Sequence, residues 1–355
     1  MNERTTAPAG WSSRGTSRSE FRITEAGGGR QLLRFALFGA VALVAVLAPF
    51  LVEGISVSDL TRTVATTISL AGLMVIMGYA GQLSMGHGAL TGVGAYSMVL
   101  FVGRWGFSYA VGIVLAILVG AVIGAIVALP SFRVGGIQLA LVTFTIATAF
   151  PPLVNRLAWL TGGPGGSPIP RLPAPGWFPD QSRSGGRLFG YFLAVTIAVV
   201  VFVALTGVLR SRVGRAWQAS RDNPLAAAAV GIPVGLSRVG AYALGGALAG
   251  LGGSLLLVET PFVVPTQFGP FVSIELYAAI VIAGARSLWG PLVGALIITL
   301  LPELLFRRWG LGAEEWVIPI VLVLATFLRP QGLLPPDRPR SLAAPSGEAV
   351  STVGR

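Results

Sequence analysis

The 355-residue chain has no cysteine, one histidine and no lysine, because all 25 of its basic residues are arginine. Without cysteine there is no thiol nucleophile, no disulfide and no cysteine-ligated metal, and one histidine cannot form a histidine-rich metal site. Without lysine there is neither the phosphate-binding lysine of a Walker A motif nor a Schiff base. These absences argue against an enzyme and predict that the chain itself binds no metal or cofactor.

Charge is also scarce: 11% of the residues are charged, whereas 54% are hydrophobic and the mean hydropathy is +0.77. A soluble domain does not need so many apolar residues for its core. The sequence therefore predicts an all-α, polytopic membrane protein. Its net charge of +11 comes from arginines in the tails and loops, where they set topology and contact anionic lipid, so nucleic acid is not an expected partner.

About ten membrane-spanning segments are expected, separated by charged, glycine-rich or proline-rich stretches. They form one transmembrane domain at residues 35–328, between a disordered tail at residues 1–34 and a second tail at residues 329–355. Six arginines precede the first span, so the positive-inside rule and an even number of spans place both tails in the cytoplasm. The expected spans cover residues 35–52, 64–77, 78–102, 109–129, 137–153, 189–209, 239–258, 271–285, 291–306 and 316–328.

The third segment starts with a polar, glycine-rich stretch in which Gln82, Ser84 and His87 interrupt the apolar pattern at about membrane depth. Polar groups at that depth need partners from protein or water, so a broken or re-entrant start is expected. The pattern Ala-Gly-x-x-Ser at residues 80–84 recurs at residues 283–287. It indicates either two related halves or a chance match in a chain rich in glycine and alanine.

Glycine is abundant, with 48 residues, and no collagen-like period explains it. Pairs of glycines four residues apart at residues 88–92, 246–250 and 290–294 form small-residue faces. Such faces let the backbones of membrane helices approach closely, so tight helix packing is predicted there.

A polar and basic segment at residues 210–238, here called the basic loop, lies between the sixth and seventh expected spans. Each of its arginines would cost about 2.5 to 3.5 kcal/mol at the membrane centre, so the loop is expected in water at the cytoplasmic face. Within it, Asn223 and Pro224 are typical of an N-cap and a first helical residue, and Gly231 ends a short helix at about residues 225–230. The residues alone are equally explained by a solvated loop that obeys the positive-inside rule.

The stretch GYAGQLSMGHGALTGVGAY at residues 78–96 closely resembles a signature of the permease subunits of branched-chain amino acid ABC importers, the Liv family, and specifically its M-type subunit. Blocks at residues 215–231, 273–305 and 329–334 resemble that family's cytoplasmic loop, late double span and C-terminal exit. The resemblance implies a permease for branched-chain or similar hydrophobic amino acids in the cytoplasmic membrane of a bacterium or archaeon. It implies as partners a second permease in a heterodimer, two ATPase subunits that hold ATP and Mg, and an external substrate-binding protein.

Under this resemblance the basic loop couples the permease to the ATPases. An apolar group of residues is expected to make the contact, and a charged pair to orient it: Leu225, Ala226, Ala227, Val230 and Gly231 with Arg221 and Asp222. Family members often carry acidic residues near the positions of Pro224 and Ala228. Both are lost here, so docking through shape and apolar contact is expected.

The resemblance also implies a substrate path along the start of the third segment and the fifth span, lined by Gln82, Ser84, His87, Thr143, Thr145 and Thr148. The alternative is that the hydroxyls bond backbone in their own helices and that His87 is a packing group. The family also serves urea, amides and aromatic acids, so these substrates stay open. An autonomous secondary transporter or channel is less favoured, because the first seven spans lack the carboxylates that ion-coupled carriers bury.

Overall fold

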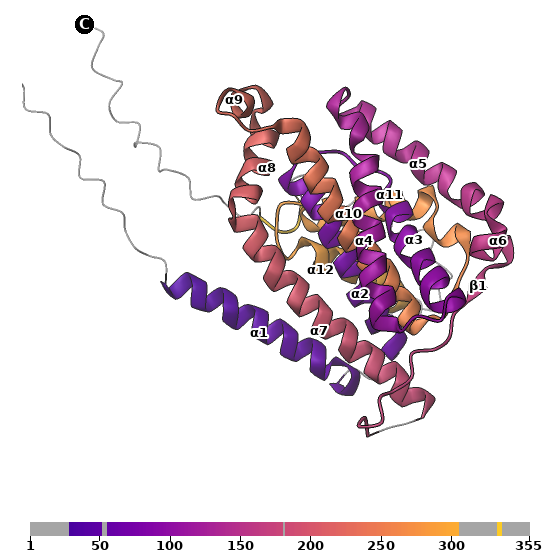
Figure 1. Ribbon diagram of the computed structural model, residues 1–355. Coiled ribbons are helices and arrows are strands. Elements are labelled where there is room, and N and C mark those ends of the chain that lie inside the picture. The colour runs from indigo at the N-terminus through magenta and orange to yellow at the C-terminus, as the bar shows by residue number, and fades with distance from the viewer. Residues whose placement is uncertain (1–27, 52–54, 180–181, 305–331, 336–355) are drawn as a thin grey trace, which may run out of the picture. The chain divides into compact units, whose positions relative to one another are not determined.

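The computed structural model describes residues 28–51, 55–179, 182–304 and 332–335 (Figure 1). Residues 1–44 and 45–355 form two compact units. The described part of the first unit is helical and belongs to α1 (Gly28–Leu51), which therefore begins inside the expected N-terminal tail. The rest of that tail, the expected tenth span and nearly all of the C-terminal tail lie outside the described residues.

The larger unit is almost entirely helical in its described part. Its elements up to the long loop are α2 (Val57–Leu73), the π-helical η1 (Met74–Tyr79), α3 (His87–Met98), the π-helical η2 (Val99–Arg104), α4 (Tyr109–Val127), η3 (Leu129–Phe132), α5 (Ile137–Arg156), α6 (Ala158–Thr161), η4 (Gly163–Gly165) and the short strand β1 (Ser167–Pro168). The later elements are α7 (Arg183–Arg210), α8 (Arg212–Asp222), α9 (Pro224–Ala229), α10 (Val234–Glu259), the short strand β2 (Phe262–Val263), η5 (Pro265–Phe268), α11 (Pro270–Ala283), α12 (Gly290–Ala295) and the π-helical η6 (Leu296–Leu300).

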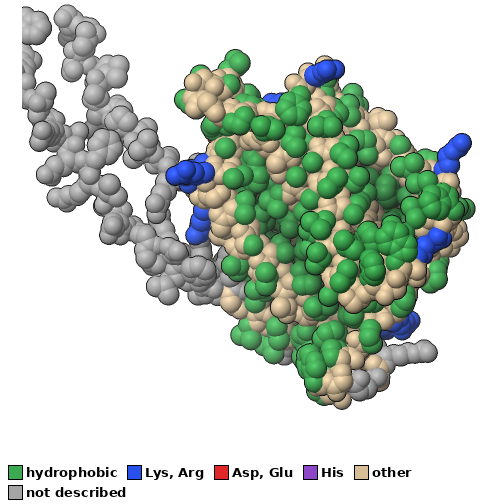
Figure 2. Space-filling view, viewed as in Figure 1, with side chains coloured by type: hydrophobic (Ala, Val, Ile, Leu, Met, Phe, Trp, Pro, Cys, Tyr) green, Lys and Arg blue, Asp and Glu red, His purple; other side chains and the backbone are tan. Residues whose placement is uncertain are grey.

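Six helices of the described chain are long and apolar enough to cross a membrane: Val57–Tyr79, Tyr109–Phe132, Ile137–Arg156, Gly185–Arg210, Val234–Glu259 and Pro265–Ala283. The expected first and ninth spans correspond to shorter apolar helices, Gly39–Phe50 and Gly290–Leu304. The expected count of ten is therefore not confirmed, although the helical membrane class is. Figure 2 shows apolar side chains over most of one face, with arginines at its edges.

Helix α4 separates small from large side chains in a way that suits a membrane. Its buried face carries residues no larger than alanine at every fourth position: Gly112, Ala116, Gly120 and Gly124. Its exposed face carries large aliphatic side chains: Val111, Val114, Leu118, Val122 and Ile126. Apolar side chains point outward because lipid, unlike water, does not penalise their exposure, and the small face is free to pack against protein.

Helix α10 lies at the centre of the larger unit, packed against α2, α3 and α4 (Figure 1). A Cβ atom on Gly246 would lie 2.2 Å from the carbonyl oxygen of Gly120, and one on Gly250 would lie 2.4 Å from that of Ala116. The predicted close packing at residues 246–250 is thus confirmed as backbone-to-backbone contact with α4. At Gly88 and Gly92 the nearest atoms belong instead to side chains of other segments.

The helices of the larger unit present two ends. One end, called here the loop end, carries the long connection between α5 and α7, which contains α6, η4 and β1. Contacts there join Ser58 to Glu259, Arg104 to Trp159, Tyr109 to Pro170, and β1 to β2 in an antiparallel pair with Ser167 opposite Val263. At the end that carries the basic loop, contacts join Trp217 to Ser237, Arg238 to Ser131, and Gly78 to Arg221. Helix α10 runs from the second end to the first.

Candidate functional site

The basic loop folds into two short helices between α7 and α10. Ser211 separates α7 from α8, and its hydroxyl accepts a hydrogen bond from the Val213 amide at 3.1 Å, as an N-cap does. Trp217 on α8 is 2% exposed and donates from Nε1 to the Ser237 carbonyl of α10 at 2.8 Å. Helix α8 is therefore fixed to the beginning of α10.

Helix α9 has the boundaries that its sequence predicts. The Asn223 side chain accepts from the Ala226 amide at 3.0 Å, and Pro224 occupies the first helical position. At the other end Gly231 has a φ of +84°, and the amides of Gly231 and Ile232 both donate at 3.0 Å to carbonyls of the last turn, as in a Schellman motif. The local chemistry of these residues accounts for both ends of the helix.

The expected ATPase-contact residues differ in their exposure. Leu225 is 84% exposed and Val230 is 77% exposed, and Ala226 and Gly231 are also exposed. Ala227 is only 3% exposed, so it holds α9 against the protein and is not part of the outward surface. Leu225 lies in the first turn of α9 and Val230 is its C-cap residue, so this short, capped helix presents a large apolar side chain near each of its ends.

Arg221 links the basic loop to the polar break in the third segment. Its guanidinium donates to the backbone carbonyl of Gly78, and it also donates to Asp222 Oδ1 from Nε at 2.9 Å and from Nη2 at 2.7 Å. Gly81 lies against the same side chain: its φ is +67°, and a Cβ there would be 2.2 Å from Arg221 Cγ. The charged pair therefore connects α8 to the end of η1.

The chain between η1 and α3 is not helical, as the sequence predicts. The amides of Ala80 and Gln82 still bond back to Val75 and Ile76 at 3.0 and 2.9 Å, and these bonds close the helix before the break. The following residues run without helical hydrogen bonds until α3 begins at His87. The break lies at the same end of the molecule as the basic loop.

Four of the six expected path residues gather at this break, and all four are buried: Gln82, Ser84, His87 and Thr143. Thr143 of α5 accepts from the Met85 amide at 2.9 Å, and Gln82 donates to the Ala80 carbonyl at 3.2 Å. His87 Nε2 lies 2.7 Å from the Ser69 carbonyl, so this nitrogen is the donor, while Nδ1 is buried without a partner in the described chain. Polar groups from three segments thus meet at the break.

Thr145 and Thr148 are not at the break. Both are exposed on α5, and their hydroxyls donate to carbonyls of their own helix, at 3.0 Å to Leu141 and 2.8 Å to Thr145. This is the geometry of the alternative interpretation, in which threonine hydroxyls satisfy themselves within a membrane helix.

A second break lies beside the first. Helix α11 ends at Ala283, Gly284 has a φ of +108°, and α12 starts at Gly290. A Cβ on Gly78 would lie 1.8 Å from the Ala285 carbonyl oxygen, so the end of η1, just before the first copy of the Ala-Gly-x-x-Ser pattern, is in backbone contact with the second copy. Each copy follows the end of a helix and has its glycine in the left-handed region.

Some polar contacts between helices are not evident from apolar patterning. Ser69 and Thr91 share a hydrogen bond of 2.7 Å between α2 and α3, and Thr63 and Thr299 share one of 2.7 Å between α2 and η6. The sequence does contain several threonines and serines within residues 61–69 that could have indicated these contacts. An apolar pattern does not include them. Among the described residues no group of three or more histidine, cysteine or acidic side chains is arranged to hold a metal.

Comparison with known proteins identifies relatives over most of the chain. Residues 56–326 match the family model described as the branched-chain amino acid transport system / permease component. The chain is 30% identical to the high-affinity branched-chain amino acid transport system permease protein LivM of Salmonella typhimurium, over 87% of this chain and 77% of LivM. It is 28% identical to LivM of Escherichia coli K12, over 85% of this chain and 75% of LivM, and 23% identical to the permease protein LivH of the same strain, over 77% and 92%. No solved structure matches the chain.

Proposed function

The chain belongs to the branched-chain amino acid transport permease family, and from that premise we propose that it is the transmembrane subunit of an ATP-driven importer of branched-chain or similar hydrophobic amino acids. It hydrolyses no ATP; ATP and Mg bind to two separate ATPase subunits. An external binding protein delivers the amino acid. The subunit lies in the cytoplasmic membrane of a bacterium or archaeon.

The observation that carries the coupling role is the placement of α9. Leu225 and Val230 are exposed at the tip of a helix that is capped at both ends, and Ala227 anchors it. Exposed large apolar side chains on a short helix in a water-facing loop are available for a partner to cover, and such a helix suits a groove on an ATPase. Movement of α8 and α9 reaches the break at residues 80–86 through Arg221.

The orientation follows from arginine placement. Many of the described arginines lie at the end with the basic loop, including Arg133, Arg210, Arg212, Arg215, Arg221, Arg238 and Arg286. By the positive-inside rule, this distribution supports our proposal that this end faces the cytoplasm and the loop end faces outside. We propose, from the six arginines that precede the first expected span, that both termini are cytoplasmic.

We further propose that the partner permease is a different chain. The chain resembles both LivM and LivH of one Escherichia coli strain, and it resembles LivM over its length with the higher identity. Two paralogous permeases in one cell suit a heterodimer. The paired breaks at residues 80–86 and 284–289 also support two related halves within this permease, because the glycine of each repeated pattern has a positive φ and Gly78 lies against Ala285.

Reconstitution tests this function. The chain is purified with its second permease and ATPase subunits, inserted in liposomes with ATP inside, and supplied with the loaded binding protein. Leucine uptake should require ATP and both ATPase subunits. Uptake by this chain alone, without an ATPase, would instead show an autonomous transporter or channel. Uptake of urea, amides or aromatic acids in place of leucine would reassign the substrate class within the same mechanism.

A further inference from the structure

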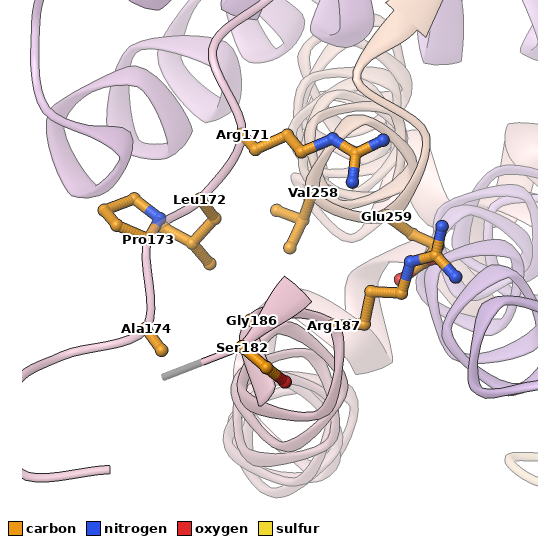
Figure 3. Close-up of a pocket in the computed structure, with 9 residues that line it drawn as sticks. All are labelled: Arg171, Leu172, Pro173, Ala174, Ser182, Gly186, Arg187, Val258 and Glu259. Atoms are coloured by element: carbon orange, nitrogen blue, oxygen red, sulfur yellow. The ribbon is translucent and has the colours of Figure 1, made fainter. Parts of the chain in front are cut away.

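A cavity of about 340 Å³ opens at the loop end, remote from the basic loop (Figure 3). It lies between the segment that follows β1, the start of α7 and the end of α10. The residues that matter for its chemistry are Arg171, Leu172, Pro173, Arg187, Val258 and Glu259. Its volume falls at the lower end of the roughly 300 to 1,000 Å³ range of small-molecule sites.

Two arginines border the cavity. Arg171 comes from the extended segment, is exposed, and has no hydrogen-bond or ion-pair partner among the described residues. Figure 3 shows its guanidinium extending across the cavity on the side of Val258. Arg187 is 53% exposed, and its Nε lies 3.6 Å from Glu259 Oε1, a loose ion pair. A free guanidinium with five donors is suited to a carboxylate.

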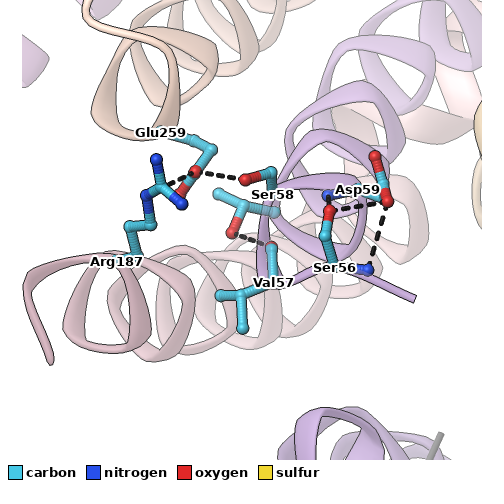
Figure 4. Close-up of polar contacts among 7 residues, drawn as sticks. Ser56, Val57, Ser58, Asp59, Arg187 and Glu259 are labelled. Atoms are coloured by element: carbon cyan, nitrogen blue, oxygen red, sulfur yellow. Dashed lines mark hydrogen bonds and ion pairs between the residues drawn. The ribbon is translucent and has the colours of Figure 1, made fainter. Parts of the chain in front are cut away.

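Glu259, at the end of α10 and beside Arg187, supplies the opposite charge (Figure 3). Its side chain is 5% exposed, and Oε1 accepts a hydrogen bond from the Ser58 hydroxyl at 2.5 Å (Figure 4). The second oxygen, Oε2, is buried without a hydrogen-bond partner in the described chain. A buried carboxylate oxygen with no donor is unfavourable, so a ligand that brings an ammonium group would satisfy it.

Other residues of the cavity lining are apolar. Leu172 and Pro173 form one side, and Val258, which is 8% exposed, forms the other. A simple anion would bring no donor to Glu259 Oε2, and a simple cation would meet the two arginines. The arrangement fits a ligand that carries both charges and an aliphatic group.

We propose that this cavity binds a zwitterionic amino acid with an aliphatic side chain. Arg171 binds its carboxylate, Glu259 binds its ammonium group, and Leu172, Pro173 and Val258 contact the side chain. The inference rests on the proposed function for the choice of leucine as the probe, and it goes beyond that function by placing an amino acid site on the permease itself.

Binding is measured with the permease complex in lipid nanodiscs, without the binding protein. The probes are leucine, 4-methylpentanoate, which lacks the ammonium group, and 3-methylbutylamine, which lacks the carboxylate. Leucine should bind saturably and each analogue at least about tenfold more weakly, a difference of about 1.4 kcal/mol. Absence of saturable leucine binding, or equal binding of 4-methylpentanoate, would overturn the proposal.

Single substitutions then locate the site. Arg171→Gln and Glu259→Gln should each weaken leucine binding about tenfold. Arg156→Gln, at the end of α5 and outside the cavity, should leave binding unchanged. Ser58→Ala removes the hydrogen bond to Glu259 and keeps the carboxylate, so it separates loss of charge from loss of local structure. Wild-type affinity in both cavity variants would overturn the assignment.

Leucine uptake by the reconstituted importer distinguishes failure of the cavity site from failure of the proposed function. ATP-dependent leucine uptake by a permease that binds no leucine would overturn the cavity site alone. Leucine binding with the expected charge dependence, but without ATP-dependent uptake, would support the site and overturn the importer.

Discussion

Arg221 of α8 donates a hydrogen bond to the backbone carbonyl of Gly78, and so joins the basic loop to the helix that ends at the first break. The same arginine is held by Asp222, whose carboxylate is 65% exposed. The two bonded residues are 143 positions apart in the sequence, so this hydrogen bond is a direct contact between the basic loop and the helix before the break. The first prediction concerns this contact.

Arg221→Gln should reduce ATP-dependent uptake about ten- to a hundredfold, because a hydrogen bond from a charged donor contributes about 1.5 to 3 kcal/mol. Basal ATP hydrolysis by the assembled complex should persist, since α9 remains in place. The measurement is uptake and hydrolysis in the same proteoliposomes. Arg212→Gln, an exposed arginine on the same helix, is the matched control. Equal uptake in the two variants would remove the connecting role of Arg221.

Gly78→Ala should destabilise the permease by about 1 to 3 kcal/mol, because the new Cβ would overlap the Ala285 carbonyl and force the two breaks apart. Thermal unfolding in detergent reports the change. Gly207→Ala on α7 is the control, since no atom lies within 4 Å of its added Cβ. Similar stability of both variants would show that the breaks can separate freely.

Leu225→Ser should leave folding unchanged, because the side chain is 84% exposed, but weaken association with the ATPase subunits about tenfold. Co-purification at graded ATPase concentrations measures the affinity. The control variant Leu225→Met keeps an apolar side chain of similar volume and should associate with the ATPase subunits as the wild type does. Undiminished binding by the serine variant would place the ATPase contact elsewhere.

Gly231→Pro should abolish transport while membrane insertion stays intact. Proline cannot adopt the φ of +84°, and it removes the amide that donates to Ala228. Gly231→Asn tolerates the left-handed conformation and should retain most of the activity. Normal uptake by the proline variant would mean that the end of α9 plays no part in coupling.

Ala227→Asp should lower the melting temperature of the complex, since it introduces an unpaired charge at a position that is 3% exposed. Ala226→Asp, one residue away and exposed, should melt like the wild type. Equal melting temperatures would contradict the anchoring role of Ala227.

The short helix α9 could be predicted closely, because Asn223, Pro224 and Gly231 fix its ends through local hydrogen bonds and backbone conformation. The break at residues 80–86 was also predictable, since glycine and polar side chains interrupt an apolar run. The burial of Ala227 was not, because one turn of an alanine helix gives no sign of which face packs.

Contacts between distant segments explain the other differences. Thr143 and Thr145 have the same side chain, yet α5 turns one toward Met85 and the other outward. The Arg221 to Gly78 bond depends on how α8 lies against η1, which no local pattern records. The span count differs because an apolar run in the sequence does not show how long its helix is: Gly39–Phe50 and Gly290–Leu304 are apolar but shorter than the helices that are long enough to cross a membrane.

The glycine contacts between α4 and α10 have a consequence for motion. No side chains lie between these backbones, so there are no rotamers to rearrange, and a rotation of either helix would drive a carbonyl oxygen into a Cα atom. We expect the two helices to move as one rigid body while transport proceeds around them. Because this chain has no cysteine of its own, spin labels at Leu118→Cys and Leu236→Cys are the only ones it carries, and the distance between them should stay constant in the nucleotide-free and ATP-bound complexes.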